Sequence, residues 1–118
     1  MRDHVKSGAL TEVTFFILLS LYRPRHGYAV MQFIEEQTRG RLVLGAGSLY
    51  GALNTLNRKG WIEPAGEDDD RRKQYRITDT GRQIAAGELA RLRALADTAA
   101  AIMEECTETD TEKEALYG

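Results

Sequence analysis

Residues 46–62, AGSLYGALNTLNRKGWI, constrain the fold most strongly, because they predict a helix that runs directly into a β-hairpin. With helical spacing, the apolar side chains gather on one side of this helix, namely Leu49, Ala52, Leu53 and Leu56. The opposite side is small and polar, and it carries Gly47, Tyr50, Gly51, Asn54 and Arg58. Such a face can enter a DNA major groove, where asparagine and arginine reach base edges and tyrosine reaches phosphate. A surface helix with a solvated polar face is the alternative.

A two-stranded hairpin follows this helix. Trp61–Glu63 is predicted to begin the first strand, which Pro64 and Gly66 are expected to end. Gln74–Thr78 is predicted to form the second strand, because its polar and apolar side chains alternate. A helix with a polar face followed by such a ribbon is the pattern of a DNA-binding helix with a wing.

The loop of this hairpin is highly charged. Three aspartates, Asp68–Asp70, precede three cations, Arg71, Arg72 and Lys73. The cations could contact the phosphate backbone or the minor groove, or the run could be an ordinary solvated loop. The aspartates could hold the arginines in place or weaken non-specific binding, and the sequence leaves both open. A divalent cation site is disfavoured, because consecutive aspartates lack the alternate spacing of a calcium loop.

Three ordered segments resemble the PadR family of bacterial transcriptional regulators: HGYAVMQFIEE, GAGSLYGALNTLNRKGWI and RRKQYRITDTGR. The resemblance covers roughly residues 8–82, including the spacing between segments. It implies a mainly α (α+β) fold: a winged helix-turn-helix of three helices and a two-stranded wing, with a long C-terminal dimerisation helix. The predicted layout is a DNA-binding domain over 1–80, a dimerisation helix over 81–106 and a frayed polar tail over 107–118.

The resemblance also implies a homodimer that represses transcription from an inverted-repeat operator. The first contacts with bases and phosphate are expected from Tyr50 and Asn54, and the resemblance favours an outward Tyr50 over a core position. His26 and Tyr28, at the start of the second helix, are expected to meet phosphate. The full set of predicted DNA-binding residues is His26, Tyr28, Gly47, Ser48, Tyr50, Gly51, Asn54, Arg58, Arg71, Arg72 and Lys73.

The remaining elements follow from local signals. A first helix is expected over residues 9–22, with a turn over Arg23–His26 and a second helix from Gly27 to about Arg39. Gly60 is expected to end the helix of residues 46–59, and Thr78 to cap the last helix.

The last helix carries a heptad pattern of apolar side chains with alternate spacings of four and three residues. Such a stripe is typical of a helix that packs against another helix, and we expect the chain's own first helix and the last helix of a second copy to share it. Packing wholly within one chain is the alternative. The predicted dimer interface is Ala85, Leu89, Leu92, Leu95, Ala96, Ala99, Ile102 and Met103. Cys106 continues the stripe and is interpreted as a small apolar side chain rather than a redox sensor.

Charge is unevenly distributed along the 118 residues, although the net charge is only −2. Residues 39–82, which include the polar helix and hairpin, hold nine cations and six anions, whereas residues 83–118 hold three and eight. A local basic face matters more for phosphate attraction than the total. The negative total keeps a second hypothesis open, a winged-helix protein-interaction module without DNA binding.

Composition argues against several other classes. The chain has two histidines, one cysteine, no metal-ligand spacing and no phosphate-binding glycine loop, so we expect no enzyme, metal or cofactor. The apolar run 13–22 is too short to cross a membrane, and the first residues lack the apolar region of a signal peptide. A single cysteine fits a reducing cytoplasm.

A small-molecule effector is a further candidate partner, because the resemblance includes short relatives that stack flat drugs on a tryptophan of the last helix. This chain has no aromatic residue between Gln83 and Cys106, and Trp61 is expected to pack under the wing. An aromatic drug pocket is therefore disfavoured.

Overall fold

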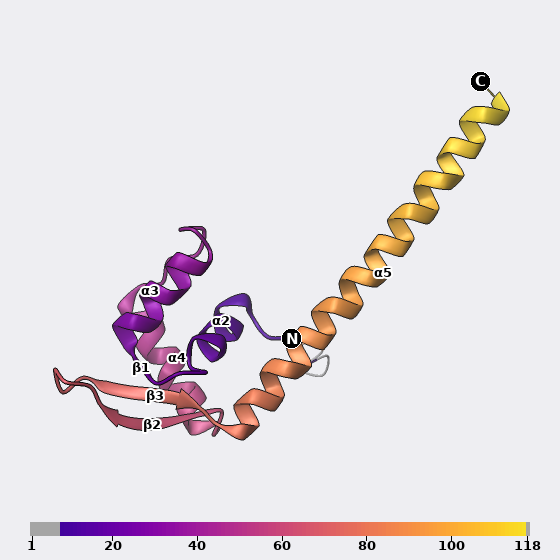
Figure 1. The fold of residues 1–118 in the computed structure, drawn as a ribbon. Helices are drawn as coiled ribbons and strands as arrows, with labels where there is room; N and C mark the ends of the chain where they lie inside the picture. The colour runs from indigo at the N-terminus through magenta and orange to yellow at the C-terminus, as the bar shows by residue number, and fades with distance from the viewer. Residues whose placement is uncertain (1–7, 118) are drawn as a thin grey trace. The chain divides into compact units, whose positions relative to one another are not determined.

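The computed structural model describes residues 8–117, and the side chains of residues 8–107. Within this range the chain has four helices and three strands (Figure 1). They are α2 (Glu12–Ser20), β1 (Arg25–His26), α3 (Gly27–Gln37), α4 (Ala46–Arg58), β2 (Ile62–Glu67), β3 (Lys73–Ile77) and α5 (Asp79–Tyr117). The predicted winged helix-turn-helix is confirmed. The outer parts of the first and last predicted segments, residues 1–7 and 118, lie outside the described residues.

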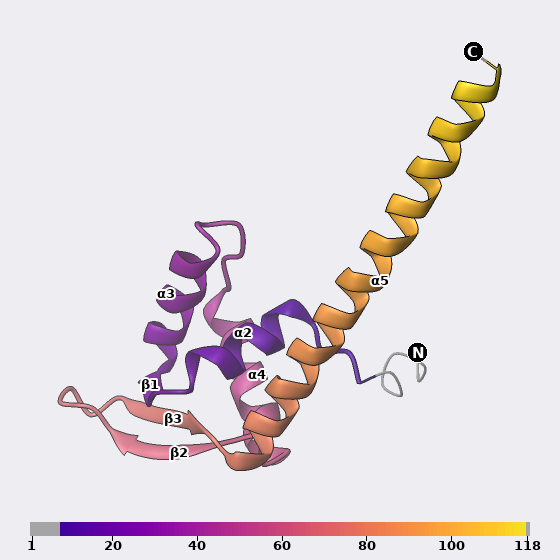
Figure 2. The same cartoon turned by 45° about the vertical axis from the view of Figure 1, so that its right-hand side comes forward.

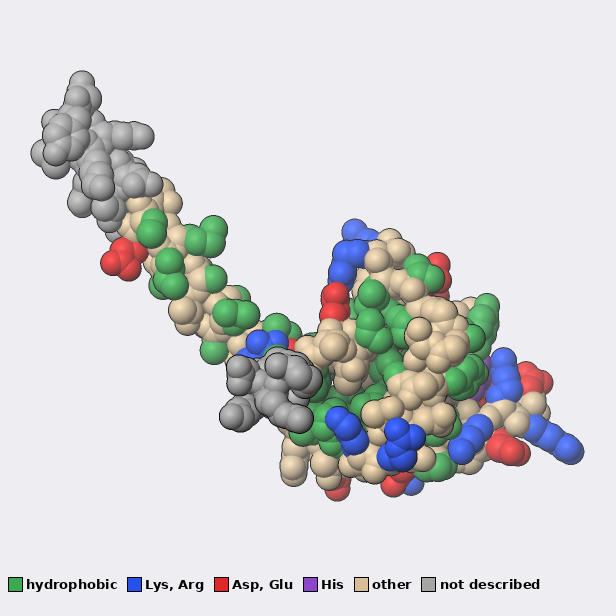
Figure 3. Space-filling model, turned by 180° about the vertical axis from the view of Figure 1, so that it is seen from behind, with side chains coloured by type: hydrophobic (Ala, Val, Ile, Leu, Met, Phe, Trp, Pro, Cys, Tyr) green, Lys and Arg blue, Asp and Glu red, His purple; other side chains and the backbone are tan. Residues whose placement is uncertain are grey.

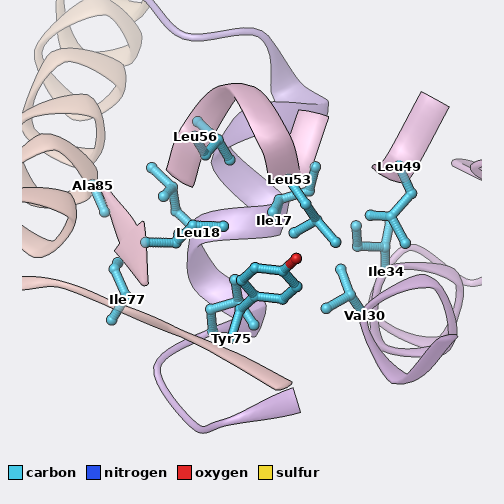
Figure 4. Packing of buried hydrophobic residues seen from close by; sticks show 12 residues of the cluster. Ile17, Leu18, Val30, Ile34, Leu49, Leu53, Leu56, Tyr75, Ile77 and Ala85 are labelled. Carbon is cyan, nitrogen blue, oxygen red and sulfur yellow. The ribbon is translucent and has the colours of Figure 1, made fainter. Parts of the chain in front are cut away.

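The core lies between α2, α3, α4 and the sheet. The predicted inner stripe of α4 is confirmed, because Leu49, Leu53 and Leu56 are at most 4% exposed. Figure 4 shows these side chains meeting Val30 from α3, Ile17 and Leu18 from α2, and the Tyr75 ring from β3. Each fully buried aliphatic side chain of this kind contributes about 1.5–3 kcal/mol relative to an exposed one. The buried stripe fixes which face of α4 remains outside.

Side-chain caps define where the helices begin. Thr11 caps α2 by accepting a hydrogen bond from the Thr14 N–H at 3.1 Å, which makes the helix begin later than the predicted residue 9. Thr78 accepts from the Gly81 N–H at 3.1 Å and caps α5 as predicted. Gly60 takes a positive φ of 78° directly after α4, so it ends that helix in the conformation that favours glycine.

The sheet has three strands in the order β1-β3-β2, so the predicted two-stranded wing is incomplete. Part of the predicted turn Arg23–His26 is the strand β1, in which Arg25 pairs with Tyr75 and His26 with Gln74. A two-residue strand is too short to produce an alternating pattern, so the sequence did not reveal it. The consequence is that the start of α3 is fixed directly to the wing.

The first wing strand is longer than predicted. β2 continues through Pro64 and Gly66 as far as Glu67. Proline is tolerated because β2 lies at the edge of the sheet. The register shifts between Pro64 and Glu67, and Gly66 has a positive φ of 85° within this irregularity. Because β2 continues as far as Glu67, the β2–β3 hairpin reaches beyond the base of α3, as Figure 2 shows.

The chain divides into two compact units, one ending at Glu88 and the other beginning at Leu89. The helix α5 continues to Tyr117, so the prediction that it ends near residue 106 in a frayed tail is wrong for the backbone. No proline or glycine interrupts the sequence between Gly87 and Gly118, which leaves the helix without a breaker. None of the helices in the described part of the chain is long and apolar enough to span a membrane.

Candidate nucleic-acid interface

The outer face of α4 is exposed along its whole length. Every residue predicted for this face is exposed, namely Gly47, Ser48, Tyr50, Gly51, Asn54 and Arg58. Thr55, also exposed, donates a hydrogen bond to the Gly51 carbonyl at 3.1 Å. The Asn54 amide has no hydrogen-bond partner among the described residues, so its donors and acceptor face solvent. A helix surface of this shape offers free hydrogen-bonding groups with little steric bulk.

Tyr50 is not a core residue, since 48% of its surface is exposed. Its ring lies against Gly27, the first residue of α3. A Cβ added to Gly27 would lie 2.6 Å from the Tyr50 hydroxyl oxygen and 2.7 Å from two ring carbons. Glycine is therefore needed at position 27 for the ring to keep its place. The sequence interpretation missed this contact, although the segment HGY (residues 26–28), with which α3 begins, is its local signal.

His26 has a structural role that the sequence interpretation did not include. Its Nδ1 accepts a hydrogen bond from the Ala29 N–H at 3.2 Å and caps α3. Only 14% of its side chain is exposed, whereas Tyr28 is 54% exposed. The two rings are nearly parallel, with centroids 6.5 Å apart. Of the two predicted phosphate contacts at this helix start, Tyr28 is the more accessible.

Asp68 organises the wing loop. Its Oδ1 accepts hydrogen bonds from the backbone N–H groups of Asp70 at 2.9 Å and Arg72 at 2.8 Å. Its Oδ2 accepts from Arg72 Nε at 2.8 Å and lies 3.6 Å from Nε2 of His26. One carboxylate thus joins the two ends of the loop and reaches the capping residue of α3.

The electrostatics of the loop follow from these contacts. The backbone N–H of Arg72, followed by its side chain, holds the pKa of the Asp68 carboxyl below its usual value. Arg72 also pairs with Asp70 at 3.2 Å. Of the two alternatives for the aspartates, this arrangement favours the one in which they hold an arginine in place. Figure 3 shows acidic and basic side chains together at the tip of the hairpin.

The other two cations of the loop differ from Arg72. Arg71 has a positive φ of 62°, a conformation that few residues other than glycine adopt, and its side chain is exposed. The Lys73 ammonium lies 5.3 Å from the centroid of the Tyr75 ring. The three predicted wing cations therefore lie in one loop but in three different environments.

Apolar side chains line the second unit. The exposed large ones are Leu89, Leu92, Leu95, Ile102 and Met103. Ala96, Ala99 and Cys106 of the predicted stripe are exposed as well. Ala85 differs, because it is 2% exposed and belongs to the core of the winged unit. Its assignment to a dimer interface is wrong, since a side chain buried within its own chain has no surface left for a partner.

Trp61 packs partly buried against the core, as expected for a residue under the wing. The Lys59 ammonium lies 4.7 Å from the centroid of its ring. Within the described residues, no group of three or more histidine, cysteine, aspartate or glutamate side chains could hold a metal ion.

Comparison with known proteins identifies the family. The sequence model of the Transcriptional regulator PadR-like family matches residues 17–86, more than half of the chain. The chain is also 41% identical over 61 residues to an uncharacterized 37.1 kDa protein in transposon TN4556 of Streptomyces fradiae. That alignment covers 52% of this chain but only 17% of the transposon protein.

Solved structures share the fold. A PadR family transcriptional regulator from Eggerthella lenta is 22% identical, with a TM-score of 0.67 over 86% of this chain and 88% of that one. A transcriptional regulator from Clostridium thermocellum is 23% identical, with a TM-score of 0.66 over 84% and 93% of the two chains. RosR from H. salinarum is 29% identical, with a TM-score of 0.59 over 78% and 96%.

Proposed function

The chain belongs to the PadR-like family of transcriptional regulators, and from this membership we propose that it is a homodimeric repressor that binds an inverted-repeat DNA operator. As a member of this family it is a transcriptional regulator and not an enzyme, as the sequence predicted. The observation that carries the proposal is the exposed polar face of α4, on which Tyr50 lies against the start of α3.

In this proposal α4 reads the major groove. Asn54 can pair with the N6 and N7 atoms of adenine, and Tyr50 can donate a hydrogen bond to a phosphate oxygen. Tyr28 lies at the positive end of the α3 dipole, where an anion is also favoured. The wing cations add contacts that do not depend on base sequence.

The test of DNA binding uses a labelled duplex covering the region upstream of the protein's own gene, at stated salt concentrations. Asn54→Ala should weaken binding by about 1–3 kcal/mol and relax the preference at one base position. Gln83→Ala removes an exposed amide from a different helix and is the matched control, expected to bind as the parent does. Parental affinity for Asn54→Ala would contradict the assignment of α4. A parent that binds no duplex would instead favour the protein-interaction module.

The proposed dimer uses the apolar stripe of the second unit. A single winged domain contacts a short stretch of duplex, so specificity for an operator calls for two copies on symmetric half-sites. The stripe from Leu89 to Met103 leaves apolar side chains in water within a single chain, and a second copy of the helix would cover them.

Sedimentation at micromolar concentration tests this assembly. Leu92→Glu would place two unpaired charges at the interface, at a cost of several kcal/mol, and should yield a monomer that does not bind the operator. Ala94→Glu adds the same charge two residues further along, on the opposite side of the helix from Leu92, and should stay dimeric. A monomeric parent, or a dimeric Leu92→Glu variant, would refute this use of α5.

A small-molecule effector would release this repressor under the same proposal. The sequence between Gln83 and Cys106 offers aliphatic and polar side chains but no aromatic ring, so such an effector would be held by aliphatic packing rather than by stacking. Thermal unfolding of the parent with and without candidate compounds tests this part, since a ligand that binds the folded state raises the transition temperature.

A further inference from the structure

The three cations of the wing loop are not equivalent, and this difference deepens the proposed DNA binding, on which the inference rests. We infer that Asp68 and Asp70 hold Arg72 within the wing, so that Arg71, rather than Arg72, is the arginine of the wing that contacts phosphate. Asp68 is then a positioning residue for DNA binding rather than a contact.

The first step of the argument is that Arg72 is already occupied. Its Nε donates to Asp68 Oδ2 at 2.8 Å, and its second guanidinium nitrogen donates to Asp70 Oδ2 at 3.2 Å. Its backbone N–H also donates to Asp68, so the main chain and the side chain of one residue bind the same carboxylate. A phosphate that approached this guanidinium would meet two carboxylates that already balance its positive charge.

The second step is that Asp68 is fixed. An isolated exposed ion pair is usually weak, because two mobile side chains must be ordered in water. The Asp68 side chain is only 15% exposed, and two backbone N–H groups define its orientation. Nε2 of His26 lies 3.6 Å from the same carboxylate, and His26 is fixed by its pairing with β3 and by the cap of α3. The pair is therefore held more firmly than a typical surface pair.

The third step concerns Arg71. Its backbone N–H donates to the Asp68 carbonyl at 2.9 Å, which closes the turn. Arg71 adopts a φ of 62° in this turn, although it is not a glycine. No described residue forms a hydrogen bond or ion pair with the Arg71 guanidinium, which is exposed at the end of the hairpin. Its charge is therefore free for a phosphate, and the turn that Asp68 closes determines where the guanidinium lies.

The salt dependence of binding measures this division of roles. The logarithm of the affinity falls with the logarithm of the salt concentration by about 0.9 for each phosphate contacted. Arg71→Ala should reduce this slope by about 0.9, whereas Arg72→Ala should leave it at the parental value. The two variants are a matched pair, because each removes one positive charge from adjacent positions. The measurement uses the full chain and a labelled duplex from the region upstream of its own gene.

A second background tests the aspartates themselves. Replacing both carboxylates (Asp68→Asn with Asp70→Asn) leaves amide oxygens that can still accept the backbone hydrogen bonds of the loop but removes the charges that hold Arg72. In that background Arg72→Ala should now reduce the slope by about 0.9, because the released guanidinium has become a phosphate contact. Thermal unfolding of each variant verifies that the winged unit is folded.

The outcomes separate the inference from the proposed function. Equal losses of slope for Arg71→Ala and Arg72→Ala in the parent would overturn the inference while DNA binding stands. An Arg72→Ala slope that stays unchanged in both backgrounds would show that the aspartates do not hold Arg72 from DNA, and would overturn it as well. A parent that binds no duplex at low salt would overturn the proposed function, and the inference with it.

Discussion

The contact between Gly27 and Tyr50 allows a test of the α4 face that does not alter any proposed DNA contact directly. In Gly27→Ala the new methyl group would lie 2.6 Å from the Tyr50 hydroxyl oxygen. Ordinary contacts between such atoms are about 3.5–4.0 Å, so the ring must move by about 1 Å or rotate away. Because Tyr50 is half exposed, the ring can turn toward solvent without disturbing the core.

Two energies decide the outcome. Alanine is favoured over glycine in a helix by up to about 1 kcal/mol, which offsets the loss of ring packing, so the free energy of unfolding should change by less than about 1 kcal/mol. A hydrogen bond from the Tyr50 hydroxyl to a phosphate is worth about 1.5–3 kcal/mol, because the acceptor is charged. Displacing the ring should therefore weaken DNA binding by about 10- to 100-fold.

The assay combines fluorescence anisotropy with a labelled operator duplex and urea unfolding of the same samples. Tyr50→Ala should weaken binding to a similar extent, and Gly27→Ala should have no further effect in that background, because the side chain it displaces is gone. Parental binding by Gly27→Ala would refute the role of Tyr50. Equal losses from Gly27→Ala with and without the Tyr50 side chain would show that the methyl group acts through something else.

Three further predictions follow from the backbone and the charges. Gly81→Ala should lower the free energy of unfolding by about 1–3 kcal/mol, because its Cβ would lie 2.1 Å from the Trp61 carbonyl oxygen. Gly87→Ala in the same helix has no atom within 4 Å of its new Cβ and should raise the free energy of unfolding by up to about 1 kcal/mol, so urea unfolding of the two variants tests the prediction. Arg71→Gly should raise the free energy of unfolding by up to about 1 kcal/mol, because glycine adopts a positive φ without strain, and it should weaken DNA binding because a cation is lost. A lower thermal stability of this variant would contradict the strain at position 71. Arg72, mainly through its backbone N–H, lowers the pKa of Asp68. The stability that this carboxylate adds is therefore complete above its unfolded-state pKa and is lost as the pH falls through its folded-state pKa. Unfolding measured across that pH range should show the parent and Asp68→Asn converging in stability in strong acid.

The exposure of the candidate α4 face could be predicted, because that face is what remains when the apolar side of the helix is buried. The positions of Leu49, Leu53 and Leu56 determine the exposure of Asn54 by helical geometry alone. The same periodicity could not predict the two-residue strand β1, which depends on pairing with a segment about 50 residues away.

The role of the wing aspartates could not be predicted either. A run of three aspartates before three cations is compatible with many pairings, and only the turn geometry selects Asp68 as the acceptor. Likewise, the heptad stripe on α5 does not show where intrachain packing stops. Ala85 fits the stripe as well as Leu89 does, but it is buried in the winged unit while Leu89 is 42% exposed.

The two outer strands of the sheet also bear on how copies of this chain meet in a crowded cell. An open sheet edge is a template on which another chain can add a strand, which leads to aggregation. Here one edge, β1, is only two residues long, and the other, β2, contains a proline, a glycine with positive φ and a shift in register. Neither edge offers the long regular row of donors and acceptors that an incoming strand needs. In the proposed dimer, two copies would therefore meet through the apolar side of α5 rather than through the edges of the sheet.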